Sequence, residues 1–466
     1  MTVETAALTG ALVDLVDEID FAGLPVEAVE TAKAAILDGV GVALAGYGEE
    51  AAGVVLRHAR AAYAGGAASI LGADLRLAPI GAALVNGTLV HALDFDDTAW
   101  SYIGHPTAVI LPAALAAGEH AGASGRELIA AYVAGFEVAS RVGRPVAEIL
   151  AERGWHLTST VGVLGAAAAA GKLLGLTGRR LAQTLGAAAT QAAGLKANFG
   201  WNAKPFHAGM AARSGVESAQ LVDAGLSASP CVLDDRLGFF AAFTGAEPAT
   251  QAQDGLAILG DGIAFKRYPS CTGTHAVIDA LLALCGEHGI RPEDVELVTC
   301  GTTPEVPSEL LHPFPDDADQ ARFSMNFAAA VALAEGAVEL EHFSEEVLAQ
   351  PLIRELMARC ELVVDPRLDR PPAVRTPAAL VEVRLTSGAT VARRVDSAKG
   401  NPQNPLAPEE LAAKFRACAA RRLRDDGQVR ALQETLLHLE ELADVEEIAT
   451  VARPRTRPVR ANRRSR

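Results

Sequence analysis

Long runs of alanine, leucine and valine at helical spacing are the feature that most constrains the fold of this chain. Up to about residue 245, apolar side chains recur every three or four positions, and the runs end at glycine or at polar turns. The clearest of the expected helices cover residues 26–48, 126–142, 160–174, 181–195 and 208–224. Their faces are rich in alanine and glycine, so that neighbouring helices can approach closely. The pattern predicts a large, tightly packed helical body.

Short β-prone runs begin to alternate with helices near residue 265. The expected strands cover residues 295–301 and 360–365, and residues 379–395 carry a hairpin signal broken at Ser387-Gly388. The helices expected around them cover residues 274–288, 322–335 and 344–359, and the chain returns to helix at 408–419 and 428–439. Residues 266–397 are therefore predicted to form a compact α+β domain. A chain of 466 residues also exceeds what one core organises easily, which favours two domains and an oligomer.

The two most apolar windows, residues 107–118 and 161–176, are poorly suited to span a membrane. Both are shorter than the roughly 20 apolar residues that a span requires, and Pro112 and Lys172 interrupt them. The first residues carry Glu4 and lack the basic and apolar regions of a secretory signal. The six cysteines have neither CxxC nor zinc-site spacing, which is typical of reduced thiols. The sequence predicts a cytoplasmic protein without a membrane partner.

The formal charge of −16 disfavours a nucleic-acid partner. Seven arginines and no acid fall in residues 453–466, a proline- and arginine-rich tail that is predicted to be disordered. Without these seven arginines the formal charge would fall from −16 to −23. An acidic substrate must therefore be attracted by a local basic site, because the overall field repels it.

The densest group of polar residues is the segment HALDFDDT, which a His-Pro pair follows at residue 105. It places Asp94, Asp96 and Asp97, the hydroxyl of Thr98 and two imidazoles within fifteen residues of an otherwise apolar region. Acids that cap the backbone amides of a helix start would explain any one of these carboxylates. A divalent metal is a further alternative, although the glycine and terminal glutamate of a calcium loop are missing. Such density is hard to explain by packing, and it marks a candidate catalytic site.

Two lysine-bearing segments supply candidate carboxylate-binding groups. In residues 196–209, Lys204 precedes a helix start, where the helix dipole favours anions, so that the lysine and the backbone amides could bind a carboxylate together. His207 nearby suits a packed core histidine equally well. Lys266 lies at the predicted domain junction, where small-molecule pockets are common, and is the second candidate. Its neighbour Arg267 suits a solvated surface cation equally well.

These segments, together with the turn that carries His156, follow one another in an order and at a spacing that resemble the MmgE/PrpD family. The matching pieces are HALDFDDT with the following HP, GWHLTST, LKANFG with KPFHAG, and KRYPSCTGTH. Residues 321–328 and 399–406 resemble two further pieces of the family pattern, and the resemblance spans roughly residues 5–440. It implies a mainly α chain with a large all-helical domain (1–265 plus 398–452), a smaller α+β lid domain (266–397), a homodimer, and an active site between the domains.

The resemblance also implies a set of site residues. Residue by residue, the family's site carries over to Asp94, Thr98, His105, His156, Lys204 and Lys266, with His207 as a supporting neighbour. Arg267 and Cys271, from the segment of Lys266, complete the expected substrate-binding set, which also includes Thr98 and His207. The family acts on small di- or tricarboxylates without a metal. A nucleotide cofactor is not expected either, because residues 165–172 are continuous helix formers and no dinucleotide-binding pattern is present.

The expected activity is that of a cofactor-free lyase, a dehydratase acting on a small polycarboxylate such as 2-methylcitrate. In this hypothesis Lys204 and Lys266 bind substrate carboxylates and stabilise the charge that grows on one of them. His105, oriented by Asp94, is the general acid or base, with His156 as its counterpart. Thr98 fixes a carboxylate. An epimerase, an isomerase or a decarboxylase of a related polycarboxylate is an alternative, and so is a non-catalytic helical binding protein.

Two departures from the family pattern favour dehydration over decarboxylation. Decarboxylase-type members are expected to carry a histidine at the position of Cys271 and a tyrosine near Phe327, and this chain has neither, although His275 lies close by. The linker 99–104 and Trp201 add aromatic bulk beside the expected pocket, so that the substrate can differ from the better-known ones.

Overall fold

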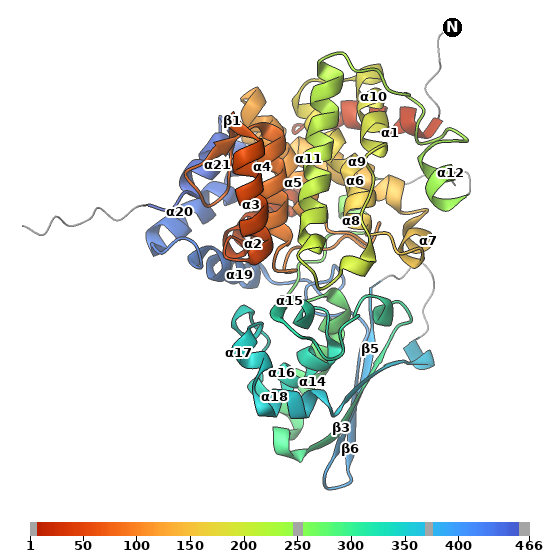
Figure 1. The fold of residues 1–466 in the computed structure, drawn as a ribbon, viewed down its shortest axis with the longest axis vertical. Coiled ribbons are helices and arrows are strands. Elements are labelled where there is room, and N and C mark those ends of the chain that lie inside the picture. Colours follow the sequence, from red (N-terminus) through yellow and green to blue (C-terminus); the bar gives the residue numbers. More distant parts are fainter. Residues whose placement is uncertain (1–6, 246–254, 369–375, 456–466) are drawn as a thin grey trace, which may run out of the picture.

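The computed structural model of the chain describes residues 7–245, 255–368 and 376–455, and most of these residues are helical (Figure 1). Its buried apolar side chains form two large clusters, one from residues 12–263 together with 411–452, and one mainly from residues 268–398. The expectation of a mainly α chain is confirmed. The domain boundaries near 265 and 398 stay a prediction, and residues 456–466 of the expected tail lie outside the described residues.

Helices from both ends of the chain build the first cluster. Those from the N-terminal side are α1 (Ala7–Glu18), α2 (Val26–Gly46), α3 (Glu50–Ala62), α4 (Pro79–His91), α5 (Pro106–Ala121), α6 (Gly125–Gly143), α7 (Ala147–Glu152), α8 (Leu157–Thr160), α9 (Gly162–Leu173), α10 (Gly178–Ala189), α11 (Ala203–Asp223), α12 (Phe239–Thr244) and α13 (Ala257–Gly260). The C-terminal helices are α19 (Pro408–Ala420), α20 (Asp426–Leu437) and α21 (Glu446–Val451), and α19 and α20, in blue in Figure 1, pack against α2. Within the described ranges, every helix is too short or too polar to cross a membrane.

Glycine brings α4 and α11 into close contact. A Cβ added at Gly87 of α4 would lie 2.8 Å from the Cα of Gly209 in α11, closer than real Cβ atoms approach. The two backbones therefore touch directly, as the glycine-rich faces predicted. This contact fixes the end of α4, which carries His91, relative to the first turn of α11, which carries Lys204.

The expectation of an all-helical first region is wrong at one point. Strands β1 (Ala64–Ser69) and β2 (Arg76–Leu77) form a small antiparallel sheet. The sequence of β1 is AGGAAS, which has neither the β-branched residues nor the alternation that identify a strand. Backbone pairing with β2, a tertiary contact, decides its conformation.

A second difference positions a histidine. Helix α10 ends at Ala189, although the periodic pattern continues to residue 195. The chain instead turns through Gly194, with φ of 122°, and the carbonyl of Gly194 accepts a hydrogen bond of 3.0 Å from the backbone N–H of His156. Because α10 ends at Ala189, the backbone of Gly194 is free to bind the turn that carries His156.

The second cluster contains residues from a four-stranded sheet in the order β4-β3-β5-β6 and from the helices packed against it. The strands are β3 (Val295–Thr302), β4 (Cys360–Val364), β5 (Ala379–Leu385) and β6 (Thr390–Val395), and the helices are α14 (His275–His288), α15 (Ala318–Ala321), α16 (Met325–Glu335), α17 (Glu345–Leu348) and α18 (Pro351–Met357). β3 and β4 are parallel, whereas β5 pairs antiparallel with β3 and with β6. The expected strands and hairpin are confirmed. The helix expected over 344–359 is split, because Pro351 can begin α18 but cannot continue α17.

Candidate active site

A pocket with an empty volume of about 400 Å³ lies between side chains of the first region and side chains of the segment 266–323. Its lining is Asp94, Thr98, Trp100, Ile103, His105, His156, Phe199, Lys204, Lys266, Cys271, Thr272, Glu309 and Phe323. The five residues predicted to be catalytic are therefore brought together, although up to 172 positions separate them along the chain. Thr98 and Cys271 of the predicted substrate-binding set also line the pocket.

The linker between α4 and α5 contains five of the lining residues, from Asp94 to His105. Asp94 lies just past the end of α4 with φ of 49°, a left-handed conformation that aspartate tolerates better than most residues. Thr98 then pairs with Ala264 through two backbone hydrogen bonds of 2.9 and 2.8 Å. Because Ala264 immediately precedes the segment of Lys266, this pairing ties the acidic linker to the second lysine.

Asp94 binds both lysines. The Lys204 ammonium contacts its Oδ1, and Nζ of Lys266 lies 2.8 Å from its Oδ2 and 2.7 Å from its backbone carbonyl oxygen. Burial by itself would raise the pKa of Asp94, but attraction to Lys204 and Lys266 holds that pKa well below its usual value. One carboxylate between two ammonium groups leaves this part of the pocket with one net positive charge, which suits an anionic ligand.

His105 lies near the predicted Asp94 but makes its hydrogen bond to another residue. Its Nε2 is 4.0 Å from the nearest oxygen of Asp94, whereas its Nδ1 lies 2.8 Å from the carbonyl oxygen of Asp97 and 3.3 Å from Oδ2 of Asp96. The ring thus donates from Nδ1 to a backbone carbonyl and leaves Nε2 toward the pocket. The oxygens of Asp94 are engaged by lysines, so that orientation of His105 falls to its other neighbours. Burial lowers the pKa of His105, although Asp96 opposes that shift.

Asp96 and His91 belong to the acidic segment that the sequence marked, but neither was assigned a role. Nδ1 of His91 lies 2.9 Å from Oδ2 of Asp96, and its Nε2 lies 3.0 Å from Nζ of Lys204. Burial lowers the pKa of His91 to about 4, so that the ring is neutral. The segment HALDFDDT signalled carboxylates and imidazoles as a group, but nothing in it distinguishes the acid that meets lysines from the acid that meets histidines.

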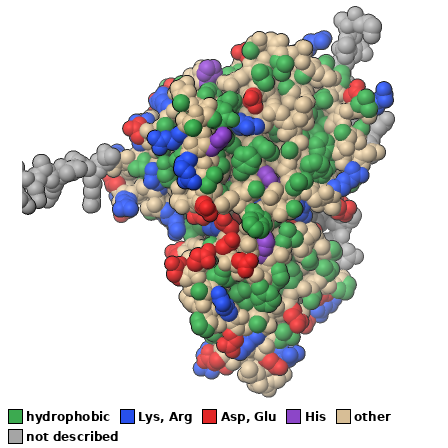
Figure 2. Space-filling view, in the orientation of Figure 1, with side chains coloured by type: hydrophobic (Ala, Val, Ile, Leu, Met, Phe, Trp, Pro, Cys, Tyr) green, Lys and Arg blue, Asp and Glu red, His purple; other side chains and the backbone are tan. Residues whose placement is uncertain are grey.

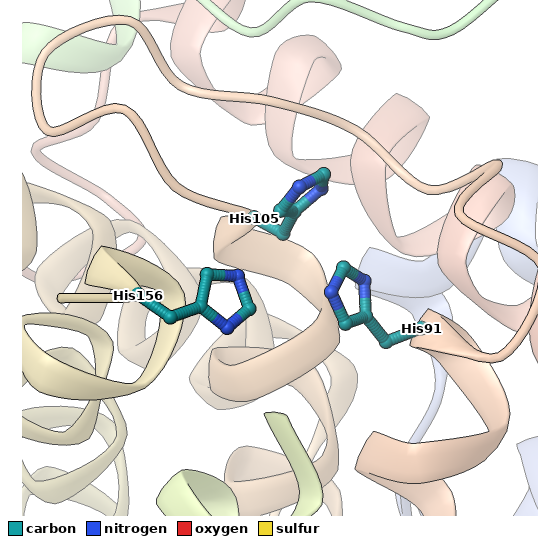
Figure 3. Close-up of side chains that lie close together, drawn as sticks. All are labelled: His91, His105 and His156. Atoms are coloured by element: carbon teal, nitrogen blue, oxygen red, sulfur yellow. The ribbon is translucent and has the colours of Figure 1, made fainter. Parts of the chain in front are cut away.

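Three imidazoles form the centre of the site (Figure 3). The ring centroid of His91 is 4.4 Å from that of His105 and 5.8 Å from that of His156, and one nitrogen from each ring lies within 4.8 Å of the others. Such a group could hold a divalent metal. The Lys204 ammonium already lies against His91 Nε2, however, so that a metal using that nitrogen would have to displace a fixed positive charge.

Two buried polar atoms of the pocket-lining residues lack a hydrogen-bond partner among the described residues. They are Oγ1 of Thr98 and Nε2 of His156. A buried polar atom without a partner costs about 1–3 kcal/mol, and a bound ligand can remove that cost. Both residues were predicted to meet the substrate, and their geometry is suited to that role.

Two members of the predicted substrate-binding set lie outside the pocket lining. Arg267 is directed to Glu339, with 3.1 Å between Nη2 and Oε1, and 39% of its side chain is exposed. Its adjacency to Lys266 in sequence is misleading, because consecutive side chains point in different directions. His207 lies behind His156, with their Nδ1 atoms 3.1 Å apart. It is a supporting neighbour and not a lining residue.

Comparison with known proteins gives the family. Residues 10–252 match the MmgE/PrpD N-terminal domain and residues 268–439 match the MmgE/PrpD C-terminal domain. The chain belongs to the MmgE/PrpD family. Human cis-aconitate decarboxylase is 32% identical over 437 residues, which cover 91% of this chain and 90% of the relative. Cis-aconitate decarboxylase of Aspergillus terreus is 28% identical over 455 residues, which cover 91% of each chain.

Several pocket residues of this MmgE/PrpD protein were not among the predicted site residues. Phe199 and Phe323 face the Lys204 ammonium, with 5.1 and 4.9 Å from Nζ to the ring centroids, which is cation–π geometry. Glu309 follows a short turn, and the Sγ of Cys271 lies 3.6 Å from its Oε2. Both phenylalanines lie in segments that resemble the family pattern, LKANFG and residues 321–328, but nothing in those segments indicated contact with the lysine, and Glu309 lies outside every such segment.

Asp97 contacts the site but does not line the pocket, and its charge state predicts a dependence of folding stability on pH. Thr107 donates its backbone N–H to Oδ1 at 3.1 Å, and its hydroxyl lies 2.5 Å from Oδ2. Burial raises the pKa of Asp97 from 3.8 to about 8. Between these values the folded state holds a proton that the unfolded state releases, so that the contribution of Asp97 to stability falls as pH rises through this window.

We expect Asp97→Asn, which resembles the protonated acid, to gain stability relative to the parent protein as pH rises from about 4 to 8. The gain is at most about 1.4 kcal/mol per pH unit and ends near pH 8. Urea unfolding across this range measures it, with the exposed Asp14→Asn as the control for loss of a charge. A pH-independent difference between Asp97→Asn and the parent would contradict the assignment.

Proposed function

We propose that this MmgE/PrpD protein is a carboxy-lyase that decarboxylates a small polycarboxylate, with cis-aconitate as the first candidate substrate. The single observation that carries the proposal is the convergence of Lys204 and Lys266 on Asp94, beside His105 and His156, in one pocket. The relatives that cover nine-tenths of the chain are cis-aconitate decarboxylases, which favours decarboxylation over the dehydration that the sequence placed first.

The sequence argument for dehydration is weakened by the position of Phe327. This side chain is fully buried in α16, packs against Phe343 with 5.4 Å between ring centroids, and is not part of the pocket lining. The lack of a tyrosine at this position therefore affects packing of the core and not contact with the substrate. Cys271 does line the pocket, so that of these two departures from the decarboxylase pattern it is the one placed to affect the reaction.

The anion must be recognised locally. Acidic side chains gather around α15 and α17 on the face shown in Figure 2. Lys204 and Lys266, each with at most 4% of its side chain exposed, supply positive charge inside the pocket instead. Because these two ammonium groups are buried, their attraction for a carboxylate is stronger than that of surface lysines.

Decarboxylation requires that the site stabilise the developing negative charge, hold the substrate and protonate the carbon that loses CO₂. The C–C bond to one carboxylate breaks and CO₂ leaves, and the electron pair spreads over the adjacent double bond and carboxylate. In the proposed mechanism Lys204 and Lys266 stabilise that charge, and Thr98 holds a carboxylate that stays. The negative charge of bound substrate raises the pKa of His105, so that this ring becomes a charged donor to the developing anion. A proton on Nε2 of His156 completes the new C–H bond.

A screen of the purified protein tests the proposal. The compounds are cis-aconitate, 2-methylcitrate, citrate and iminodisuccinate, with mass spectrometry of the products and measurement of released CO₂. We expect CO₂ and an unsaturated dicarboxylate from cis-aconitate. Loss of water from 2-methylcitrate without CO₂ would establish the dehydratase alternative. Binding without turnover of any compound would favour the non-catalytic alternative.

We expect chelators to leave turnover unchanged. A metal at the three histidines would need Nε2 of His91, which lies 3.0 Å from the Lys204 ammonium, while Asp96 takes the other nitrogen. Dialysis against a chelator followed by the CO₂ assay measures this, with added Zn²⁺ and Mg²⁺ as the comparison. Activity that is lost on chelation and restored by one metal would contradict the metal-free mechanism.

A further inference from the structure

We infer that His156 and His207 form a two-imidazole proton wire, in which His207 relays protons from outside the pocket and His156 delivers them to the substrate carbon. The inference rests on the proposed decarboxylation, because replacing a carboxylate by hydrogen consumes one proton in each turnover. His156 touches the substrate in this scheme. His207 acts only through His156 and is a positioning residue.

The contact between the two rings requires complementary tautomers. Their Nδ1 atoms are 3.1 Å apart, a hydrogen-bond distance, and the ring centroids are 5.3 Å apart. Burial lowers the pKa of His156 well below its usual value and that of His207 to about 4, so that both rings are neutral. A neutral ring has one N–H and one bare nitrogen, so that one Nδ1 donates and the other accepts. Only one proton lies between them.

The two nitrogens outside the contact, Nε2 of His156 and Nε2 of His207, have different surroundings. Nε2 of His156 is buried and has no partner within the described structure, and His156 lines the pocket. His207 does not line the pocket, and both rings are buried, with relative exposures of 5% for His207 and 4% for His156. In the proposed wire His207 is the member of the pair that lies away from the substrate. His207 lies one helical turn beyond Lys204 on α11, so that the same helix start places the substrate lysine and the relay.

The charged and titratable neighbours of the pair are consistent with neutral rings. His91 and His105 lie on the pocket side of His156, with ring centroids 5.8 and 6.4 Å away. The Lys204 ammonium lowers the pKa of both members of the pair. A positive charge on either ring is disfavoured in the empty pocket, which suits transfer of a proton through neutral tautomers.

The wire solves a chemical difficulty. A neutral imidazole is a very weak acid, and loss of its Nε2 proton alone would leave an imidazolate. In the resting state His207 donates Nδ1–H to Nδ1 of His156, which carries its proton on Nε2. When the C–C bond breaks, the Nε2 proton forms the C–H bond, the Nδ1 proton of His207 moves to His156, and solvent protonates Nε2 of His207. No imidazolate forms, and one proton is consumed with each CO₂ released.

The pair resets after the product leaves. Water in the open pocket protonates Nε2 of His156. The Nδ1 proton returns to His207, and Nε2 of His207 releases a proton to solvent. No net proton is used in this step, so that the overall balance stays at one proton for each decarboxylation.

His207→Gln and His207→Ala test the relay through turnover. Glutamine can still donate an amide N–H to Nδ1 of His156, so that it keeps the ring in place, but it cannot pass a proton on. We expect kcat of His207→Gln to fall by at least about tenfold with KM within about twofold, because the loss concerns proton transfer and not binding. Added imidazole is expected to restore kcat of His207→Ala. His58→Gln, an exposed histidine of α3, is the matched control and keeps the parent kcat.

A measurement independent of activity separates the wire from the proposed function. ¹⁵N NMR of the histidine side chains in the parent protein is expected to show His156 protonated on Nε2 and His207 on Nδ1. The same tautomer in both rings would overturn the wire, whatever reaction the protein catalyses. A parent kcat in His207→Gln, or no imidazole rescue in a parent that decarboxylates, would also overturn it. A parent that decarboxylates nothing yet shows the complementary tautomers would overturn only the proposed function.

Discussion

Replacing His105 by alanine is expected to lower kcat by about 10²- to 10³-fold while the fold stays intact. The ring lines the pocket and leaves Nε2 toward it, so that the variant loses a donor to the developing charge, an effect of about 3–4 kcal/mol in comparable sites. The side chain provides no side-chain cap for α5 and borders the pocket, so that its loss enlarges an existing space and leaves the helix start unchanged. Initial rates of CO₂ release measure the effect, and thermal unfolding checks the fold.

His120→Ala is the matched control, because His120 lies in the last turn of the same helix and is exposed. It is expected to keep the parent kcat. A His105→Ala protein that turns over at the parent rate would remove this residue from the mechanism and leave only its structural contact with Asp97.

Replacing Asp94 by asparagine is expected to destabilise the protein by about 3–5 kcal/mol and to abolish most activity. Asparagine tolerates the left-handed conformation of this position, so that the substitution tests charge and not backbone strain. It leaves Lys204 and Lys266, with side chains 4% and 1% exposed, as buried cations without their carboxylate. Removing one member of a buried ionic group lowers the free energy of unfolding by more than the intact group contributes to it, because the remaining charge stays desolvated.

A double variant separates stability from activity. Adding Lys266→Met to Asp94→Asn removes one of the two uncompensated ammonium groups and is expected to restore a large part of the lost free energy of unfolding. The double variant stays inactive, because the pocket has lost a charge that the substrate needs. Urea unfolding of the single and double variants measures the coupling. Strictly additive losses would show that Asp94 and Lys266 do not interact.

The sequence predicted the secondary structure well where periodicity and turn chemistry agree with tertiary context. The strands β3 and β4 and the hairpin of β5 and β6 occur where they were expected. The failures have local causes: β1 is formed from AGGAAS by pairing alone, and α10 stops at Ala189 to make the turn against His156. A one-dimensional pattern contains no information on either contact.

Within the candidate site, the sequence identified the lysines, the histidines and the acidic segment but not their pairing. Asp94 was expected to orient His105, and it binds Lys204 and Lys266 instead, across 110 and 172 positions of the chain. The Nδ1 of His105 instead contacts the side chain of Asp96 and the backbone carbonyl of Asp97. These acids lie within four residues of one another, and only the left-handed turn at Asp94 decides which of them faces the lysines.

By itself, the sequence determined the helical body, the strand-bearing segment, the family and the kinds of group in the pocket, because periodicity and residue chemistry are local properties that tertiary contacts rarely reverse. Only the tertiary structure decided which carboxylate neutralises which cation, that Arg267 turns to Glu339, and that His207 lies behind His156. The physical reason is that hydrogen bonds and buried ion pairs depend on distances of a few ångströms between distant segments. Packing sets those distances once the helices have closed.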